Sequence, residues 1–351
     1  MSATEQPLLE VSDLKVSFAT EDGTVQAVDG VSFTVSGGEV VAIVGESGSG
    51  KSVTAMTLMG LTRGPNAHFE GTAKFDGTEL VAASDEQLRR IRGAGIAMVF
   101  QDPMSSLDPV YRVGDQIVEQ IRVHERGFSK AQALDRAVTL MERVGIPRAA
   151  ERLRSYPHEF SGGMRQRVMI AMALSCSPKL LIADEPTTAL DVTIQAQILD
   201  ELRQLRDQTG AGVILVTHDL GVVADIADRV IVMYAGRVVE QGSLDDIFYD
   251  PQHPYTWGLL GSITRIDSDR SARLPAIPGL PPSLLAAPKG CHFRPRCPHA
   301  FDKCVEVPPL MSRVEDRPES LDRCWLPVER KRAIRQVDGR IGLRAAEPVT
   351  S

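Results

Sequence analysis

Short, continuous apolar runs recur from residue 40 to about residue 240, and each is followed by a polar loop and a helix-forming segment. The clearest runs occupy 40–44, 95–100, 180–183 and 213–217. Runs of this length without alternation are typical of strands buried on both faces of a parallel sheet. Because longer helix-forming segments separate them, the pattern predicts an α/β fold with a parallel core.

The segments before and inside this core have different patterns. Residues 8–44 alternate between apolar and polar positions, with a turn at 21–24 and two more short strands expected between 25 and 35. This alternation predicts an antiparallel layer in front of the core. Residues 113–153 instead carry apolar residues at helical spacing with no strand pattern among them, so we expect a helical subdomain over about 102–165.

The composition changes at about residue 251, where proline becomes frequent, four cysteines follow and regular periodicity fades. We therefore interpret 1–250 as one large domain and 251–330 as a small, loop-rich domain that contains the cysteines. The charged tail, 331–351, is expected to be loosely ordered.

Composition and charge restrict the classes of function. The hydrophobic fraction of 43% and the charged fraction of 24% are those of a soluble globular protein. A net charge of -7 argues against a general nucleic-acid binder. No apolar run approaches the roughly 18 residues of a membrane span, and the first residues lack the basic start and apolar core of a signal peptide. We expect a cytosolic chain whose membrane role, if it has one, comes through a partner.

A glycine-rich loop connects the first buried strand to a helix, and it has the sequence Gly45-Glu46-Ser47-Gly48-Ser49-Gly50-Lys51-Ser52. A strand, such a loop and a helix in this order form a phosphate-binding P-loop. Its glycines allow main-chain N–H groups to approach a polyphosphate, and the helix N-terminus adds further N–H groups. Lys51 is expected to reach the β- and γ-phosphates, and the Ser52 hydroxyl to bind Mg²⁺.

Polar side chains follow the other buried strands. Gln101 ends one strand, the pair Asp184 and Glu185 ends another, and His218 ends a third. Ligands of open α/β sheets bind at this carboxyl edge. We expect Asp184 to hold Mg²⁺ through water, Glu185 to face the γ-phosphate and His218 to contact it.

A second glycine pair, in Ser161-Gly162-Gly163, opens another amphipathic helix and is a second candidate anion site. The alternative for this loop is a plain helix cap. Phe18, on an early strand, is a candidate for stacking on adenine, and the alternative for it is an aromatic residue of the core.

The chain resembles the ATP-binding-cassette (ABC) ATPases over about residues 8–245. The resemblance rests on six motifs in a fixed order: the P-loop at 45–52, Gln101, Ser161-Gly162-Gly163, Asp184-Glu185, Ala189-Leu190-Asp191 and His218. Met164 departs from the family, which usually has Gln there. Segments 100–103, 156–163, 253–256 and 290–297 are similar to the ATP-binding subunits of dipeptide and oligopeptide importers. Nickel importers share these features.

The resemblance implies a P-loop ABC nucleotide-binding domain, with a RecA-like core, an antiparallel β layer and a helical subdomain. It further implies a head-to-tail pair that holds two ATP molecules, each between one P-loop and the other chain's Ser161 and Gly163. Glu185 would be the general base, His218 would contact the γ-phosphate, and Ser52, Gln101 and Asp184 would serve Mg²⁺. Asp191 would belong to the ATP site.

The same resemblance implies a set of partners at the cytoplasmic face of the plasma membrane. They are a second ATPase chain, identical or related, two membrane permeases and an extracytoplasmic binding protein that acts through the permease. Two other classes remain as alternatives. A soluble cassette ATPase acting on DNA or ribosomes usually has two cassettes or a long coiled coil, and an exporter ATPase would lack the C-terminal extension.

Four of the five cysteines, Cys291, Cys297, Cys304 and Cys324, lie within 34 residues. In a reducing compartment such a cluster more often binds metal than forms disulfides. Four thiolates suit Zn²⁺ or a [4Fe–4S] cluster, although the spacing is not the paired C-x2-C of most zinc ribbons. The subfamily resemblance favours the iron–sulfur cluster, with zinc and a metal-free set as alternatives.

Overall fold

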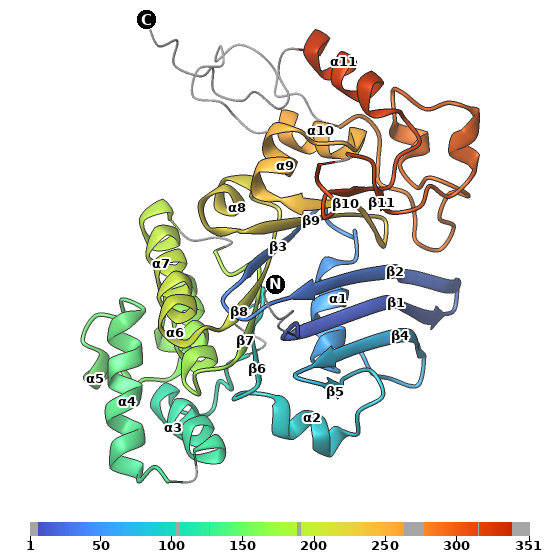
Figure 1. Ribbon diagram of the computed structural model, residues 1–351. Coiled ribbons are helices and arrows are strands. Elements are labelled where there is room, and N and C mark those ends of the chain that lie inside the picture. Colours follow the sequence, from blue (N-terminus) through green and yellow to red (C-terminus); the bar gives the residue numbers. More distant parts are fainter. Residues whose placement is uncertain are drawn as a thin grey trace, which may run out of the picture.

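The computed structural model describes residues 6–102, 106–125, 127–187, 191–262, 277–314 and 316–338. Within these residues an eight-stranded sheet runs in the order β11-β12-β10-β9-β3-β8-β7-β6 (Figure 1). Its strands are β3 (Val40–Val44), β6 (Ile96–Val99), β7 (Leu180–Asp184), β8 (Gly212–Thr217), β9 (Arg229–Tyr234), β10 (Arg237–Ser243), β11 (Met311–Ser312) and β12 (Leu321–Asp322). Strands β3, β8, β7 and β6 are parallel, as their apolar runs predicted, and β9 is a further parallel strand beside β3.

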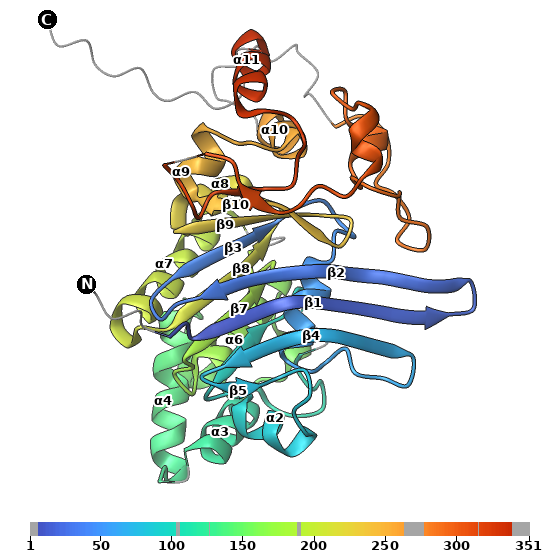
Figure 2. The same cartoon turned by 45° about the vertical axis from the view of Figure 1, so that its right-hand side comes forward.

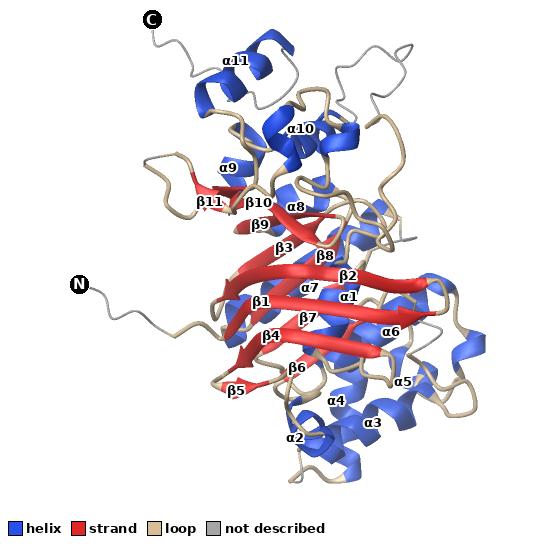
Figure 3. Cartoon of the chain, turned by 90° about the vertical axis from the view of Figure 1, so that its right-hand side faces the viewer, coloured by secondary structure: helices blue, strands red, loops and turns tan. Residues whose placement is uncertain are grey.

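A second, antiparallel sheet lies across one face of this core (Figures 2 and 3). In the described residues its order is β2-β1-β4-β5, from β1 (Leu9–Thr20), β2 (Gly23–Val35), β4 (Ala67–Phe75) and β5 (Thr78–Glu79). Buried side chains from both sheets and from α1 (Lys51–Leu58) form one hydrophobic cluster. The expected antiparallel layer is therefore present. The two short strands expected between 25 and 35 are wrong, because β2 is one strand paired along β1 through three register shifts.

Helices cover the opposite face. They are α3 (Val113–His124), α4 (Lys130–Arg143), α5 (Ala149–Arg152), α6 (Gly162–Leu174) and α7 (Val192–Thr209), with the turn η1 (Pro157–Glu159) between α5 and α6. Their apolar faces share a cluster with side chains of β6, β7 and β8. The helical spacing at 113–153 thus corresponds to helices α3, α4 and α5. In another part of the chain, α2 (Asp85–Ile91) begins at Ser84 with a capping box to Gln87.

The C-terminal extension packs on the edge of the eight-stranded sheet. It follows α8 (Leu220–Ile226) and α9 (Leu244–Tyr249) and comprises α10 (Pro254–Gly261), η2 (Arg294–Arg296), η3 (Asp302–Val305), β11, β12 and α11 (Val328–Asp338). Strand β12 pairs with β10, so the extension adds to the sheet of the core. Tyr255 and Phe293 share a hydrophobic cluster with residues of β3 and β9.

The expectation of a loosely ordered tail from residue 331 is wrong for 331–338, which belong to α11. Lys331 of this helix is fully buried and bonds Asp322 at 2.7 Å. The remainder of the tail, 339–351, lies outside the described residues. Each helix in the described residues is too short or too polar to cross a membrane.

Candidate active site

The glycine-rich loop lies where the sequence placed it, between the end of β3 and the start of α1. Gly50 is the N-cap of α1 and has a left-handed backbone, with φ 98°. A Cβ atom at this position would lie 2.5 Å from the main-chain oxygen of Ala27. Only glycine therefore fits both the backbone conformation and the space at this position. The first N–H groups of α1 have no partner within the helix and lie beside the loop.

Lys51 lies inside the loop and is 6% exposed. Its Nζ donates hydrogen bonds to the main-chain oxygens of Gly45 at 2.8 Å and Glu46 at 2.9 Å. Burial lowers the pKa of Lys51, while the carboxylates of Glu185 and Asp184 oppose that shift. An ammonium held within a ring of main-chain groups at a helix N-terminus is suited to binding phosphate oxygens.

Ser52 and Asp184 bring two oxygen ligands together across the sheet. The Ser52 hydroxyl donates to Asp184 Oδ1 at 3.0 Å, although the two residues are 132 positions apart. Burial raises the pKa of Asp184, and the bond from Ser52 opposes that shift. A hydroxyl beside a carboxylate is the kind of oxygen donor set that Mg²⁺ prefers. The residues present therefore fit the ion that accompanies ATP.

Glu185 is the centre of a cluster formed by three strand ends. Its Oε2 accepts a hydrogen bond from Gln101 Nε2 at 3.0 Å, and its Oε1 lies 3.0 Å from His218 Nδ1. The backbone of Glu185 has a positive φ of 49°, and its N–H donates to the Val216 oxygen. The parallel sheet has thus placed the predicted residues at one edge, with Glu185 held by an amide and an imidazole.

The remaining predicted ATP-site residues lie on other elements. Ser161 caps α6 by accepting from the Met164 N–H, and Gly162 and Gly163 form the first residues of that helix. Asp191 caps α7. Phe18 is partly buried against the cluster between the two sheets. The roles of these residues in the ATP site stay predictions. Residues 188–190, which include Ala189 and Leu190, lie outside the described residues.

Several residues that support this site were not predicted from the sequence. The buried amide of Gln166, on α6, donates to the Pro186 oxygen at 3.0 Å and so joins the helical subdomain to the loop after β7. Arg296 and Tyr255, both in the C-terminal extension, bond Glu46 of the P-loop. No local pattern indicates these contacts, because the partners are 20 to 250 positions apart.

Two family models match this chain. The ABC transporter model matches residues 28–188, and the model of the oligopeptide/dipeptide transporter C-terminal region matches residues 239–304. Over 333 residues the chain is 53% identical to the oligopeptide transport ATP-binding protein OppD of Salmonella typhimurium. This match covers 93% of this chain and 98% of that protein. The chain belongs to the ABC transporter ATP-binding proteins. It is therefore an ATPase whose hydrolysis of ATP is coupled to transport.

Other comparisons agree with this family. The ABC ATPase is 52% identical to the dipeptide transport ATP-binding protein DppD of Bacillus subtilis, over 93% of this chain and 96% of that protein. Among solved structures it is similar to the dimeric cassette MJ0796 bound to ADP and Pi, with a TM-score of 0.62 and 28% identity. That similarity covers 67% of this chain and 98% of the other, so the ABC fold is shared.

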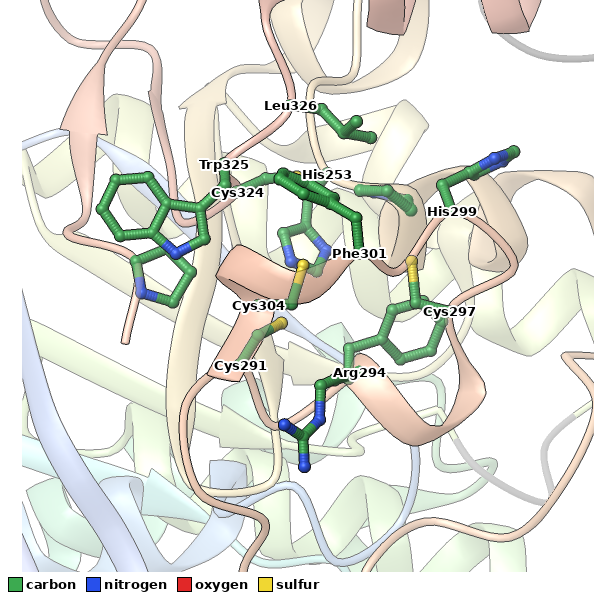
Figure 4. A pocket seen from close by; sticks show the side chains of 13 residues that line it. His253, Cys291, Arg294, Cys297, His299, Phe301, Cys304, Cys324, Trp325 and Leu326 are labelled. Carbon is green, nitrogen blue, oxygen red and sulfur yellow. The ribbon is translucent and has the colours of Figure 1, made fainter. Parts of the chain in front are cut away.

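The four C-terminal cysteines of the ABC ATPase line one pocket (Figure 4). All four are free thiols, and Cys291 donates its N–H to the Cys304 oxygen. Burial raises the pKa of Cys297 to about 11 and that of Cys324 to about 12, so both are neutral thiols at pH 7. Within the described part of the chain, no group of three or more His, Cys, Asp or Glu side chains is arranged to hold a metal ion.

The histidines near this pocket have other contacts. His253, which lines the pocket, accepts a hydrogen bond at Nδ1 from the Tyr255 N–H at 3.1 Å, and His299 packs its ring against Trp257. His292 Nδ1 lies 2.9 Å from the Ala235 oxygen. The donor set of the pocket is therefore thiol in character.

Proposed function

We propose that this ABC ATPase powers the import of dipeptides or oligopeptides. The observation that carries the proposal is the match of residues 239–304 to the oligopeptide/dipeptide transporter C-terminal region. The nucleotide site alone does not separate importers from exporters, whereas this extension is a feature of the peptide transporters that the chain resembles. A nickel or other small-solute importer is the second candidate, because the sequence features are shared.

In the proposed reaction, ATP lies with its phosphates against Lys51 and the N–H groups of the P-loop. Water attacks the γ-phosphorus, Glu185 accepts a proton from that water, and the bond to the ADP oxygen breaks. Gln101 and His218 hold the Glu185 carboxylate in place through their 3.0 Å contacts. Ser52, Asp184 and Gln101 would hold Mg²⁺, which neutralises phosphate charge when bound.

A complete site requires a second chain. The P-loop and the Ser161 helix end are two separate anion-binding helix starts on one chain. We propose that each ATP is closed between the P-loop of one ATPase chain and Ser161, Gly162 and Gly163 of another, which is identical or related. The dimeric state of the similar cassette MJ0796, in its ADP and Pi complex, supports this arrangement.

The partners proposed in the membrane are two permeases, with a binding protein on the far side. A pocket between the sheet and the helical subdomain supports permease docking at the cytoplasmic face. It is lined by Met59, Met98, Phe100, Gln120, Met169 and Met172, among others. Flexible methionine side chains adapt to a partner's surface, so this pocket suits an inserted helix. ATP-driven closure would move such a helix together with the helical subdomain.

The cargo is tested by uptake in cells that encode this chain. Loss of the chain is expected to reduce uptake of a labelled tripeptide to background, because the permeases then lack their source of energy. The wild-type chain should restore uptake, whereas a chain with Glu185→Gln should not. If uptake of labelled Ni²⁺ falls and peptide uptake is unchanged, the peptide assignment is wrong.

We further propose that Cys291, Cys297, Cys304 and Cys324 hold a [4Fe–4S] cluster, with Zn²⁺ as the alternative. Support comes from four free thiols around one pocket and from the resemblance of this segment to the peptide-importer subfamily. The thiols must lose their protons when metal binds, so assembly would release protons. The cluster would tie the loop at 291–304 to the segment that follows β12.

Anaerobic purification tests the cluster. The expected product is brown, with absorbance near 400 nm and about four iron atoms per chain. Cys297→Ser should reduce the iron content, whereas Cys176→Ser should leave it unchanged, because Cys176 is buried beside the Gln120 oxygen of α3 and does not line this pocket. Stoichiometric zinc without iron would mean that the cysteines bind zinc and not an iron–sulfur cluster. A folded product without metal would exclude both.

A further inference from the structure

The P-loop contains a carboxylate that the proposed reaction does not use. Glu46 follows Gly45, and its main-chain oxygen accepts a hydrogen bond from Lys51 Nζ. A negative charge in this loop opposes the binding of an anionic triphosphate. The loop therefore needs a compensating positive charge that does not itself occupy the phosphate site.

Arg296 supplies that charge from the C-terminal extension. Its Nη1 lies 2.6 Å from Glu46 Oε2, and its Nη2 lies 3.0 Å from Glu46 Oε1. Two parallel bonds of this kind match the planar guanidinium to the carboxylate. The side chain of Arg296 is only 5% exposed and that of Glu46 is 28% exposed, so solvent screens the pair weakly.

The guanidinium has a fixed orientation. Arg296 Nε donates to the Pro278 oxygen at 2.9 Å, and Nη2 also donates to the Ile277 oxygen at 3.1 Å. The ring of Tyr234, on β9, lies 5.8 Å below the guanidinium carbon. Since Arg296 ends the turn η2, directly before Cys297, its position depends on the cysteine segment at 291–304.

A second group of the extension holds the same P-loop residue. The N–H of Glu46 donates to the hydroxyl of Tyr255 at 2.8 Å. Tyr255 is fully buried at the start of α10, and burial raises the pKa of its hydroxyl, which therefore stays neutral. The extension thus bonds both the side chain and the main chain of Glu46.

We propose that Arg296 is a positioning residue for ATP binding. It neutralises the Glu46 carboxylate and, together with Tyr255, fixes the start of the P-loop so that its N–H groups face the phosphates. The C-terminal extension then sets the affinity of the cassette for nucleotide from a point outside the six motifs. This inference rests on ATP binding at Lys51, which belongs to the proposed function.

The test compares four variants of the full chain with wild type. They are Arg296→Ala, Arg296→Lys, Glu46→Gln and the double variant Arg296→Ala with Glu46→Gln. Arg330→Ala is the matched control, because Arg330 is an exposed arginine of the same extension. For each protein, the dissociation constant of a fluorescent ATP analogue is measured, together with KM and kcat for ATP hydrolysis.

Arg296→Ala is expected to raise the dissociation constant about tenfold, which corresponds to about 1.4 kcal/mol. The effect should fall on KM more than on kcat. The double variant should recover most of the lost affinity, because the uncompensated carboxylate is gone. The dissociation constant of Arg296→Lys should lie between those of wild type and Arg296→Ala. An ammonium group supplies the positive charge but not the two parallel hydrogen bonds of a guanidinium.

Two results would overturn the proposal. One is an affinity of Arg296→Ala equal to that of Arg330→Ala. The other is a double variant that binds nucleotide no better than Arg296→Ala, which would mean that the arginine acts only through stability. Fluorescence of Trp257 and Trp325 reports whether the extension is folded in each variant, since both tryptophans of the chain lie there.

Tyr255→Phe serves if Arg296→Ala does not fold. It removes one oxygen atom and leaves the Glu46 N–H without its partner, so we expect the dissociation constant to rise about threefold to tenfold. An unchanged constant in a folded Tyr255→Phe protein would also count against the proposal. Failure of the wild-type chain to bind the analogue would instead contradict the proposed function.

Discussion

Glu185→Gln is expected to lower kcat for ATP hydrolysis by about a hundredfold to ten-thousandfold, the usual contribution of a general base. The dissociation constant for ATP should stay within about threefold of wild type. The amide has nearly the shape of the carboxylate but cannot accept a proton from water at neutral pH. Phosphate binding depends instead on Lys51 and the P-loop, which this substitution does not touch.

The geometry around Glu185 is the reason for expecting so large an effect. Gln101 and His218 each contact one of its two carboxylate oxygens, and its side chain is 14% exposed. Its orientation is therefore set before substrate arrives, and preorganised groups of this kind supply most of the catalysis in phosphoryl transfer. In the proposed reaction, Glu185→Gln would leave the positioning intact and remove the proton acceptor.

Glu151→Gln is the matched control, because Glu151 is a 72% exposed carboxylate of the helical subdomain. It should hydrolyse ATP at the wild-type rate. Near-wild-type turnover in Glu185→Gln would mean that another group accepts the proton.

Glu185→Gln also tests the proposed pair of ATPase chains, since ATP that is bound but not cleaved should hold two chains together. Light scattering measures the mass of such a pair. A double variant with Glu185→Gln and Ser161→Arg should remain a single chain, because the arginine would obstruct the proposed contact between Ser161 and the partner's ATP.

Lys331→Ala is expected to lower the free energy of unfolding of the C-terminal extension by about 3–5 kcal/mol, the range for breaking a buried ion pair. The Nζ of Lys331 lies 2.7 Å from Asp322 Oδ1, and the two side chains are 0% and 2% exposed. Without the lysine, Asp322 keeps Arg313 at 3.5 Å but loses its nearest cation. A buried carboxylate without full compensation is costly.

Urea unfolding followed by tryptophan fluorescence measures this loss, because Trp257 and Trp325 are the only tryptophans of the chain and lie in the extension. Arg330→Ala, one position earlier on the exposed side of α11, should change the free energy by less than about 0.5 kcal/mol. Lys331→Met combined with Asp322→Leu should recover much of the stability, since no buried charge is then left. A loss as small as that of Arg330→Ala would show that the pair does not hold α11 in place.

The sequence by itself was enough to predict the candidate nucleotide site. The P-loop, Gln101, Asp184, Glu185 and His218 each lie at the end of a short apolar run, and a local pattern of a few residues identifies such a junction. The carboxyl ends of parallel strands meet at one edge, so the strand assignments were sufficient to predict that these side chains would come together. Their mutual bonds in the structure follow from that rule.

Only the tertiary structure decided how the C-terminal extension is attached. The charges of α11 resemble a solvated tail in the sequence, but Lys331, Arg332 and Arg335 pair with Asp322 and Asp250 of other segments. Arg296 and Glu46 are 250 positions apart, and neither carries a local signal of the other. Periodicity reports which face of one element is apolar, whereas the partner of a buried charge is chosen by packing between distant segments. For that reason the motifs predict the candidate nucleotide site, whereas the contacts of the extension with the P-loop are visible only in the tertiary structure.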